Sequence, residues 1–287
     1  MKPILLPYKE SIVDLYKNQQ KSIKEISKIY NCYEQPIRNL LKNEDFYRKR
    51  PNQGNIRYFQ NIDTSLKAYF LGFIAADGCL QKFTPSSKGL SITLDIKDKC
   101  ILDKLKEEIG NEHTIKVWSR KQTNSDTIST YCRFTLANNF LYYDLLNLGI
   151  IERKSLAIKN IIKNVPLEFK GSFIIGYFDG DGSVSLPKPK IKRKTNVLYP
   201  SYSIIVSIRG TIDFLQSIVD SLKLENSKLY FSKTWVLNIS NKSDILKFFK
   251  SYDNLPFYLK RKYDKFQERI NHKSFVKILQ AQTISQP

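Results

Sequence analysis

Apolar residues recur at helical spacing near the beginning of the chain. In the segment 22–30, Ile23 and Ile26 fall on one face of a helix. Ser22 can cap this helix, because Glu25 stands three residues later and completes a capping box. A second helix is expected over 34–42, after a break of three residues.

Two short helices joined by a short break are typical of a helix-turn-helix, whose second helix enters the major groove of DNA. An ordinary helical hairpin would show the same pattern. In the DNA-binding interpretation, the second helix offers side chains that could reach bases or phosphates. These are Gln35, Arg38, Asn39 and Lys42.

The rest of the chain contains an internal repeat. The segments 71–78 and 175–182 read LGFIAADG and IGYFDGDG, and each ends an apolar helix. Each is followed by two strands, a helix, two more strands and a closing helix. The strands are expected near 90–97, 114–119, 128–136, 202–209, 227–232 and 234–239, and the helices near 101–109, 138–147, 212–220 and 242–251. The predicted fold class is α+β, with two pseudo-symmetric αββαββα repeats and two antiparallel sheets.

Small residues line one face of each repeated helix. Gly72 and Ala76 are four residues apart, as are Gly176 and Gly180, so each pair shares a helix face. Small side chains let two helix backbones approach closely. We therefore expect these four residues to form the interface between the two halves.

Asp77 and Asp181 end the two repeated helices, and a carboxylate there opposes the helix dipole. Gly78 and Gly182 follow and suit left-handed helix caps. A single Asp-Gly pair would most simply be a turn. An unfavourable carboxylate at the end of a helix that occurs twice, at matching positions of a repeat, instead suggests a function. Two neighbouring carboxylates repel unless a cation lies between them. Mg²⁺ fits, because it takes one or two carboxylates with phosphate oxygens and can assist phosphodiester cleavage.

Charge narrows the class of partner. The 287 residues include 47 Lys and Arg against 27 Asp and Glu, a net charge of +20. A protein that basic usually meets a polyanion, of which nucleic acid comes first and an anionic membrane surface second. No apolar run is long enough to cross a bilayer, and the start is too short for a signal peptide. We expect an intracellular protein of a bacterial or phage-infected cytoplasm or of an organelle.

Few cysteines and histidines are present. The four cysteines form no C-x-x-C pair and read as reduced thiols. Two histidines nearly exclude a zinc finger or a nuclease built on several histidines. Catalysis would therefore rest on carboxylates, lysines and a metal ion.

The segments 70–78 and 174–182 resemble the two LAGLIDADG motifs of the homing endonuclease family, and the resemblance covers about residues 63–270. It implies a saddle of two sheets along the DNA major groove. It also implies cutting of both strands with 3′ extensions, dependent on Mg²⁺ or a substitute divalent metal, with Asp77 and Asp181 as metal ligands. The first motif departs from the pattern at Ala75, where the second has Asp179; we expect Asp179 to be a helix-end or surface partner rather than a ligand.

The resemblance also implies further catalytic positions. Lys154 and Lys262 are carried over as lysines that stabilise charge in the transition state, with Lys260 as a rival in the second half. Asp98 matches a polar position near the attacking water. The second half has Gly210 there, and unequal cutting of the two strands is a hypothesis that follows.

Basic side chains that could hold DNA lie in the long connection after the second motif, in one long hairpin and within the strands. The long connection contains Lys188, Lys190, Lys192, Arg193 and Lys194. The hairpin contains Arg120 and Lys121, and the strands contain Lys97, Arg133 and Arg209. The sequence does not determine on which side of its sheet each strand residue lies.

The predicted domains are a helix-turn-helix over 1–47, a linker over 48–62, the halves 63–158 and 159–270, and a tail over 271–287. We expect a monomer acting on a long duplex that is pseudo-symmetric or asymmetric. A non-cleaving binder on the same scaffold stays open, either a maturase for its own intron RNA or a transcription regulator. An intein nuclease is disfavoured, because the sequence ends without the terminal His-Asn that splicing would require. A DNA-bridging protein would leave the repeated Asp-Gly ends unexplained.

Overall fold

The computed structural model describes residues 5–19, 21–43, 52–121, 126–152, 161–188, 190–192, 197–199, 203–253 and 255–271. The chain divides into two compact units, Met1–Pro51 and Asn52–Pro287. Each unit has a hydrophobic core of its own.

The first unit is all-helical. Its elements are η1 (Leu6–Tyr8), α1 (Lys9–Lys17), α2 (Ile23–Ile29) and α3 (Glu34–Asn43). The predicted capping box is confirmed, since Ser22 Oγ accepts from the Glu25 N–H at 3.2 Å and the Ser22 N–H donates to Glu25 Oε2 at 2.7 Å. Asn31, at φ 44°, turns the chain between α2 and α3. Ile12, Ile26 and Ile37 are fully buried where the three helices meet.

In the second unit, the first half of the repeat comprises α4 (Ser65–Asp77), β1 (Gly78–Thr84), β2 (Ser87–Asp95), η2 (Ile96–Asp98), α5 (Lys99–Ile109), β3 (Lys116–Lys121), β4 (Ile128–Ala137) and α6 (Asn139–Asn147). Its antiparallel sheet has the order β1-β2-β4-β3.

The second half comprises η4 (Ile161–Asn164), η5 (Leu167–Phe169), α7 (Lys170–Asp181), β5 (Gly182–Ser185), β8 (Ile205–Gly210), α8 (Ile212–Leu222), β9 (Lys228–Ser232), β10 (Thr234–Ile239), α9 (Lys242–Lys250) and α10 (Lys260–Ile270). Its sheet, β5-β8-β10-β9, repeats the topology of the first. A separate hairpin, β6 (Lys190–Lys192) with β7 (Val197–Tyr199), stands between β5 and β8 in the sequence. The predicted α+β repeat is confirmed, and α10 is an addition to it.

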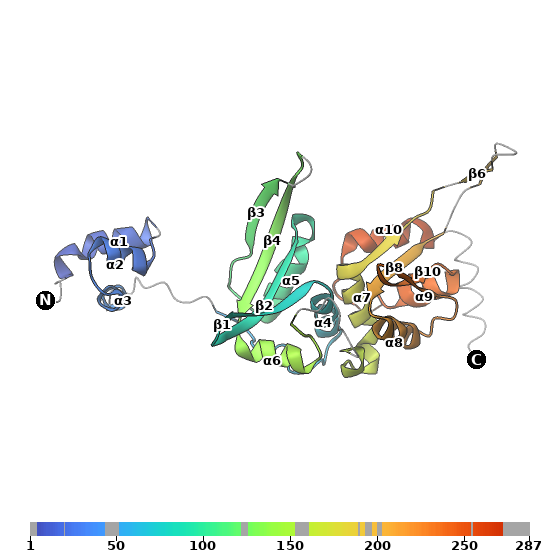
Figure 1. Ribbon diagram of the computed structural model, residues 1–287, viewed down its shortest axis with the longest axis horizontal. Helices are drawn as coiled ribbons and strands as arrows, with labels where there is room; N and C mark the ends of the chain where they lie inside the picture. The colour runs from blue at the N-terminus through green and yellow to red at the C-terminus, as the bar shows by residue number, and fades with distance from the viewer. Residues whose placement is uncertain are drawn as a thin grey trace. The chain divides into compact units, whose positions relative to one another are not determined.

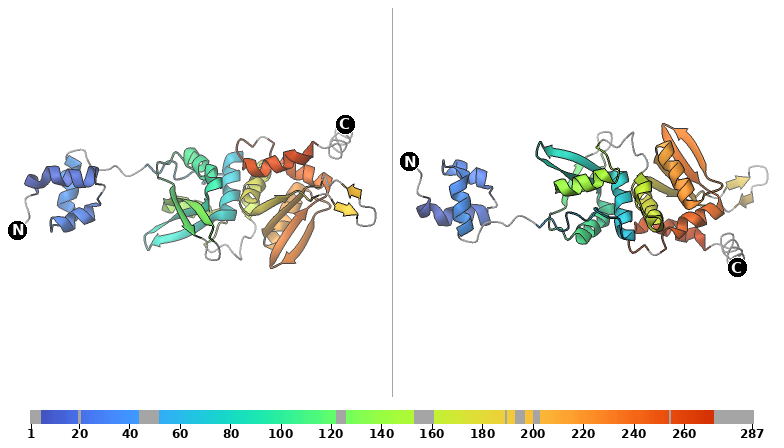
Figure 2. Two further views of the ribbon diagram at one scale, coloured as in Figure 1. Left: turned by 90° about the horizontal axis from the view of Figure 1, so that it is seen from above. Right: turned by 90° about the horizontal axis from the view of Figure 1, so that it is seen from below.

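The two repeated helices, α4 and α7, pack side by side at the centre of the second unit, with one sheet on each side (Figure 1, Figure 2). One continuous core joins both halves. Strand residues alternate between this core and solvent. Phe134 and Ile208 are fully buried, whereas Arg133 and Arg209 next to them are exposed.

We call the solvent-facing side of each sheet its open face. In the first sheet it carries Cys79, Thr93, Trp118, Arg120, Tyr131 and Arg133. In the second it carries Ser183, Ser207, Arg209, Tyr230, Ser232 and Val236.

Two local predictions are wrong. Gly78 (φ −70°, ψ 154°) and Gly182 (φ −89°, ψ 162°) are extended rather than left-handed, because each begins a strand directly. Glycine is needed there for space, since a Cβ at Gly182 would lie 2.1 Å from Cδ2 of Phe178. The strand expected to reach Lys97 ends at Asp95, so Lys97 lies in η2.

None of the helices among the described residues combines the length and the apolar character that crossing a membrane requires.

Candidate active site

Helices α4 and α7 approach closely because glycines face the opposing backbone. A Cβ added at Gly72 or Gly176 would lie 2.0 or 1.9 Å from a carbonyl oxygen of the other helix. A Cβ at Gly180 would lie 2.3 Å from Cβ of Ala76. All four residues proposed for the half-half interface therefore lie in this contact.

The close packing brings the two helix ends together. Asp77 and Asp181 are the last residues of α4 and α7. A Cβ at Gly180 would lie 3.1 Å from Oδ2 of Asp77, so this carboxylate reaches the last turn of α7. The pKa of the Tyr177 phenol is raised far above its usual range, first by burial and then by the charges of Asp181 and Asp77. Both carboxylates thus lie near one phenol, which donates to the carbonyl oxygen of Arg209 at 2.9 Å.

Asp181 opens onto the sheet rather than onto the core. It borders a hollow of about 380 Å³ on the open face of the second sheet. The other residues that line this hollow are Ser183, Ser207, Arg209, Tyr230, Ser232 and Val236. A ligand lying along the open face would therefore meet this carboxylate.

The residue types at the helix ends fit a hard divalent cation. Asp77 and Asp181 offer only carboxylate oxygens, the donors that Mg²⁺ prefers. Among the described residues, no group of three or more His, Cys, Asp or Glu gathers at one point. A cation at this site would thus be held by two carboxylates and completed by water and substrate oxygens, which is the usual pattern for Mg²⁺.

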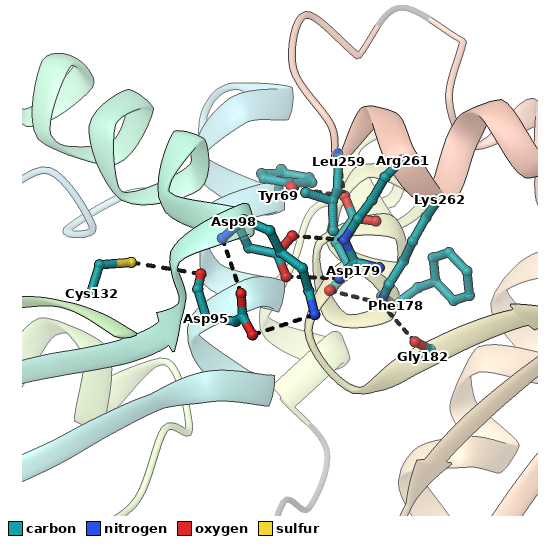
Figure 3. A network of polar contacts seen from close by, with 11 residues as sticks. Tyr69, Asp95, Asp98, Cys132, Phe178, Asp179, Gly182, Leu259, Arg261 and Lys262 are labelled. Atoms are coloured by element: carbon teal, nitrogen blue, oxygen red, sulfur yellow. Dashed lines mark hydrogen bonds and ion pairs between the residues drawn. The ribbon is translucent and has the colours of Figure 1, made fainter. Parts of the chain in front are cut away.

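Lys262 is buried beneath the end of α7, with 5% of its surface exposed. Its Nζ donates to the carbonyl oxygens of Phe178 at 2.6 Å, Asp179 at 2.8 Å and Gly182 at 2.6 Å (Figure 3). Burial lowers its pKa to about 8. A cation on the last carbonyls complements the helix dipole and offsets the unfavourable Asp181. These contacts give Lys262 a positioning role, and its direct action on a phosphate stays a prediction.

The other predicted lysines contribute less to this geometry. Lys260 is exposed and pairs with Asp264 at 2.8 Å. Lys154 lies outside the described residues.

Asp179 lies in the last turn of α7, but it is buried, with 3% exposure, rather than at the surface. Its Oδ2 accepts from the Tyr69 hydroxyl at 2.8 Å and from the Leu259 N–H at 2.7 Å (Figure 3). Oδ1 has no hydrogen-bond partner among the residues that the structure describes. Burial raises the pKa of this carboxyl to about 6. Asp179 therefore ties α7 to α4 and to the segment that leads into α10.

Replacing Asp179 by asparagine is expected to change how stability depends on pH. The native pKa of about 6 lies above the unfolded value of about 3.9, so the native state binds more protons between these values. Asp179 therefore makes stability fall as pH rises through this window, and Asp179→Asn should remove that contribution. Urea unfolding of both proteins from pH 4 to pH 8 measures the difference.

Asp179→Ala is the contrasting variant. It leaves the Tyr69 hydroxyl and the Leu259 N–H buried without their acceptor, which should cost about 1–3 kcal/mol relative to Asp179→Asn at every pH, since neither variant titrates at this position. A stability difference between wild type and Asp179→Asn that stays constant from pH 4 to pH 6 would contradict the prediction.

Asp98 is engaged by an arginine of the other half. Arg261 of α10 donates through Nε and Nη2 to the two oxygens of Asp98, each at 2.7 Å (Figure 3). Asp98 therefore joins the end of η2 to α10. Its proposed place beside an attacking water stays a prediction.

The proposed DNA-binding residues of the second unit fall into three groups. Arg120, Arg133 and Arg209 lie on the open faces. Two of the proposed lysines form ion pairs with aspartates. Lys121 pairs with Asp126 at 2.5 Å, and Lys97 pairs with Asp95 at 3.5 Å. In the long connection Lys188 is exposed, the backbones of Lys190 and Lys192 form β6, and Arg193 and Lys194 lie outside the described residues.

In the helical unit, α3 presents its polar side opposite the buried Leu41. Gln35 donates to Asn39 at 2.8 Å, and Arg38 pairs with Glu34 at 3.4 Å. Lys42 is exposed near the end of α3.

Three contributors to the site were not foreseen from the sequence. Tyr177 is expected from the sequence only as a core residue of the second motif, Tyr69 lies just before the first motif, and Arg261 stands beside Lys262 in a basic segment. A buried tyrosine needs a partner for its hydroxyl, which is the one sequence signal that could have raised Tyr69 and Tyr177 as candidates.

The sequence of residues 174–270 matches the family described as LAGLIDADG endonuclease. The solved structure of meganuclease I-AabMI bound to uncleaved DNA is similar with a TM-score of 0.50 and 13% identity, over 75% of this chain and 91% of that one. At that identity, the likeness shows a shared fold.

Two further structures are I-SmaMI bound to an uncleaved DNA target with calcium ions (TM-score 0.45, 17% identity, 75% and 96% covered) and I-GzeII with its DNA target (TM-score 0.45, 16% identity, 74% and 96% covered). No curated protein sequence matches the chain.

Proposed function

Because residues 174–270 match the family described as LAGLIDADG endonuclease, we propose that the chain is a site-specific homing endonuclease that cuts both strands of a long DNA duplex. The observation that carries the proposal is the junction of α4 and α7. There two carboxylates end adjacent helices, and one of them borders a hollow on the open face of a sheet.

Asp77 and Asp181 would hold Mg²⁺ or a similar divalent metal together with phosphate oxygens. When bound, such an ion supplies activation of water and stabilisation of the leaving oxygen in phosphodiester hydrolysis. Lys262 and Asp179 hold the last turn of α7, which carries Asp181. The cut is proposed to leave 3′ extensions.

The partner is double-stranded DNA lying along both open faces. A net charge of +20 supplies the phosphate attraction, and Arg133 and Arg209 stand where base edges would pass. One chain carries both halves, so we propose that it acts as a monomer.

The direct test is incubation of the full-length protein with a library of randomised duplexes, with Mg²⁺ and, in parallel, with EDTA. Double-strand breaks at one long site that require the metal support the proposal. Tight, salt-sensitive binding without cutting would overturn the nuclease and favour the regulator or, if intron RNA is bound, the maturase.

Removing residues 1–51 is expected to weaken binding of the target while leaving cleavage at raised protein concentration. The helical unit has a separate core, so the remainder should fold without it. Each phosphate contact that is lost should reduce the slope of log Kd against log salt concentration by about 0.9. Affinity measured from 50 to 200 mM salt, with thermal unfolding as the control, checks this. An unfolded truncation, or one with unchanged affinity, would contradict the separate DNA-binding role.

A further inference from the structure

The open faces of the two sheets differ in chemistry although their topology is the same. Strand pairing aligns them, because Gly78 pairs with Ile92 as Gly182 pairs with Ile208. Continuing this alignment across both sheets gives pairs of corresponding positions. They are Thr93 with Arg209, Arg133 with Val236, Tyr131 with Thr234, and Trp118 with Ser232.

The first sheet carries an alternating stack of guanidinium groups and rings, which we call the arginine–aromatic ladder. The Arg133 guanidinium lies 5.1 Å from the centroid of the Trp118 ring. That ring stacks on Tyr131, with centroids 5.9 Å apart and planes at 27°. Arg120 lies 5.1 Å from the Tyr131 centroid. The ladder thus runs from Arg133 to Arg120 along β3 and β4.

The ladder holds Arg133 in a defined orientation. Its Nε donates to Thr93 Oγ1 at 2.8 Å, while Trp118 supports the guanidinium plane. The terminal Nη groups are then the part that can meet a base edge. An arginine held in place loses less side-chain entropy on binding, and arginine pairs in a bidentate manner with O6 and N7 of guanine.

The second sheet has no such ladder at the corresponding positions. Val236 stands in place of Arg133, Ser232 in place of Trp118, and Thr234 in place of Tyr131. A hydroxyl can both donate and accept and so distinguishes bases weakly, and valine offers only apolar contact. Arg209 is the guanidinium among the aligned positions, and it takes the place of Thr93.

We propose that the arginine–aromatic ladder makes recognition asymmetric: the half-site on the first sheet requires guanine opposite Arg133 and Arg120, whereas the half-site on the second sheet is read loosely. The inference rests on the proposed function, since it takes the open faces as the surface that meets DNA. Trp118 and Tyr131 are positioning residues that act through the two arginines.

Selection of bound sequences from a randomised duplex library tests this with the full-length protein and four variants. Arg133→Gln removes one guanidinium of the ladder, and Trp118→Leu removes its support. Arg209→Gln removes the guanidinium on the open face of the second sheet, so the base position that it alters identifies the half-site read by that sheet. Phe231→Leu is the matched control, since this aromatic is 66% exposed on the opposite side of β9.

Wild type is expected to prefer guanine about 10-fold or more over adenine at one position that becomes indifferent in Arg133→Gln. Trp118→Leu should weaken the preference at that same position, while affinity for unrelated DNA is kept. The position altered by Arg209→Gln should lie in the other half-site and show a smaller preference. Phe231→Leu should match wild type.

Equal loss of affinity for all sequences in Arg133→Gln would mean a phosphate contact and would overturn the inference. So would an unchanged guanine preference in Trp118→Leu. In either case wild type would still select and cut one long site, so the proposed function would stand. A wild type that selects no sequence and cuts no DNA would overturn both.

Discussion

Asp77→Asn combined with Asp181→Asn is expected to lower strand cleavage at least about a thousandfold. Two carboxylates end the adjacent helices, and asparagine at both positions removes the negative charge that would hold the cation. A bound metal contributes several kcal/mol to the stabilisation of the transition state, and about 4 kcal/mol corresponds to that factor. Single-turnover cleavage of a selected target in Mg²⁺ measures it.

Binding should survive the same double substitution. Removing two negative charges beside a phosphate backbone should leave affinity for the duplex unchanged or slightly tighter. Asp213→Asn, an exposed carboxylate in the first turn of α8, is the matched control and should cut like wild type. Cleavage by the double variant at the wild-type rate would overturn the assignment of these two carboxylates.

Gly176→Ala is expected to destabilise the second unit by about 3 kcal/mol or more. Its Cβ would lie 1.9 Å from the carbonyl oxygen of Tyr69 and 3.0 Å from the backbone nitrogen of Phe73, and neither can move without separating α4 from α7. Urea unfolding monitored by circular dichroism measures the change. Cleavage should fall too, because the two helix ends would no longer meet.

Gly171→Ala in the same helix is the matched control. There the new Cβ would lie 3.3 Å from the Ser251 side chain, which can shift, and alanine has the better helix propensity by about 1 kcal/mol. Its stability should stay within about 1 kcal/mol of wild type. Equal effects of the two substitutions would mean that the close approach of the backbones does not limit stability.

Much of the architecture could be predicted from the sequence, because it depends on local periodicity and on repetition. The capping box at Ser22, the two apolar helices ending at Asp77 and Asp181, and the αββαββα order each depend on residues close together in the chain. The outer strands β9 and β10 agree almost to the residue with the predicted strands near 227–232 and 234–239, since alternation and a tight turn are local properties.

The tertiary structure decided what surrounds each charge. Asp179 is buried because Tyr69, 110 residues away, and Leu259, 80 residues away, close over it, and no local pattern encodes either contact. Lys262 meets the end of α7 for the same reason. The sequence likewise does not determine on which side of the sheet Arg133 lies. Alternation gives two equivalent faces, and only packing against the helices distinguishes them. Because Phe134 packs into the core, Arg133 next to it faces solvent.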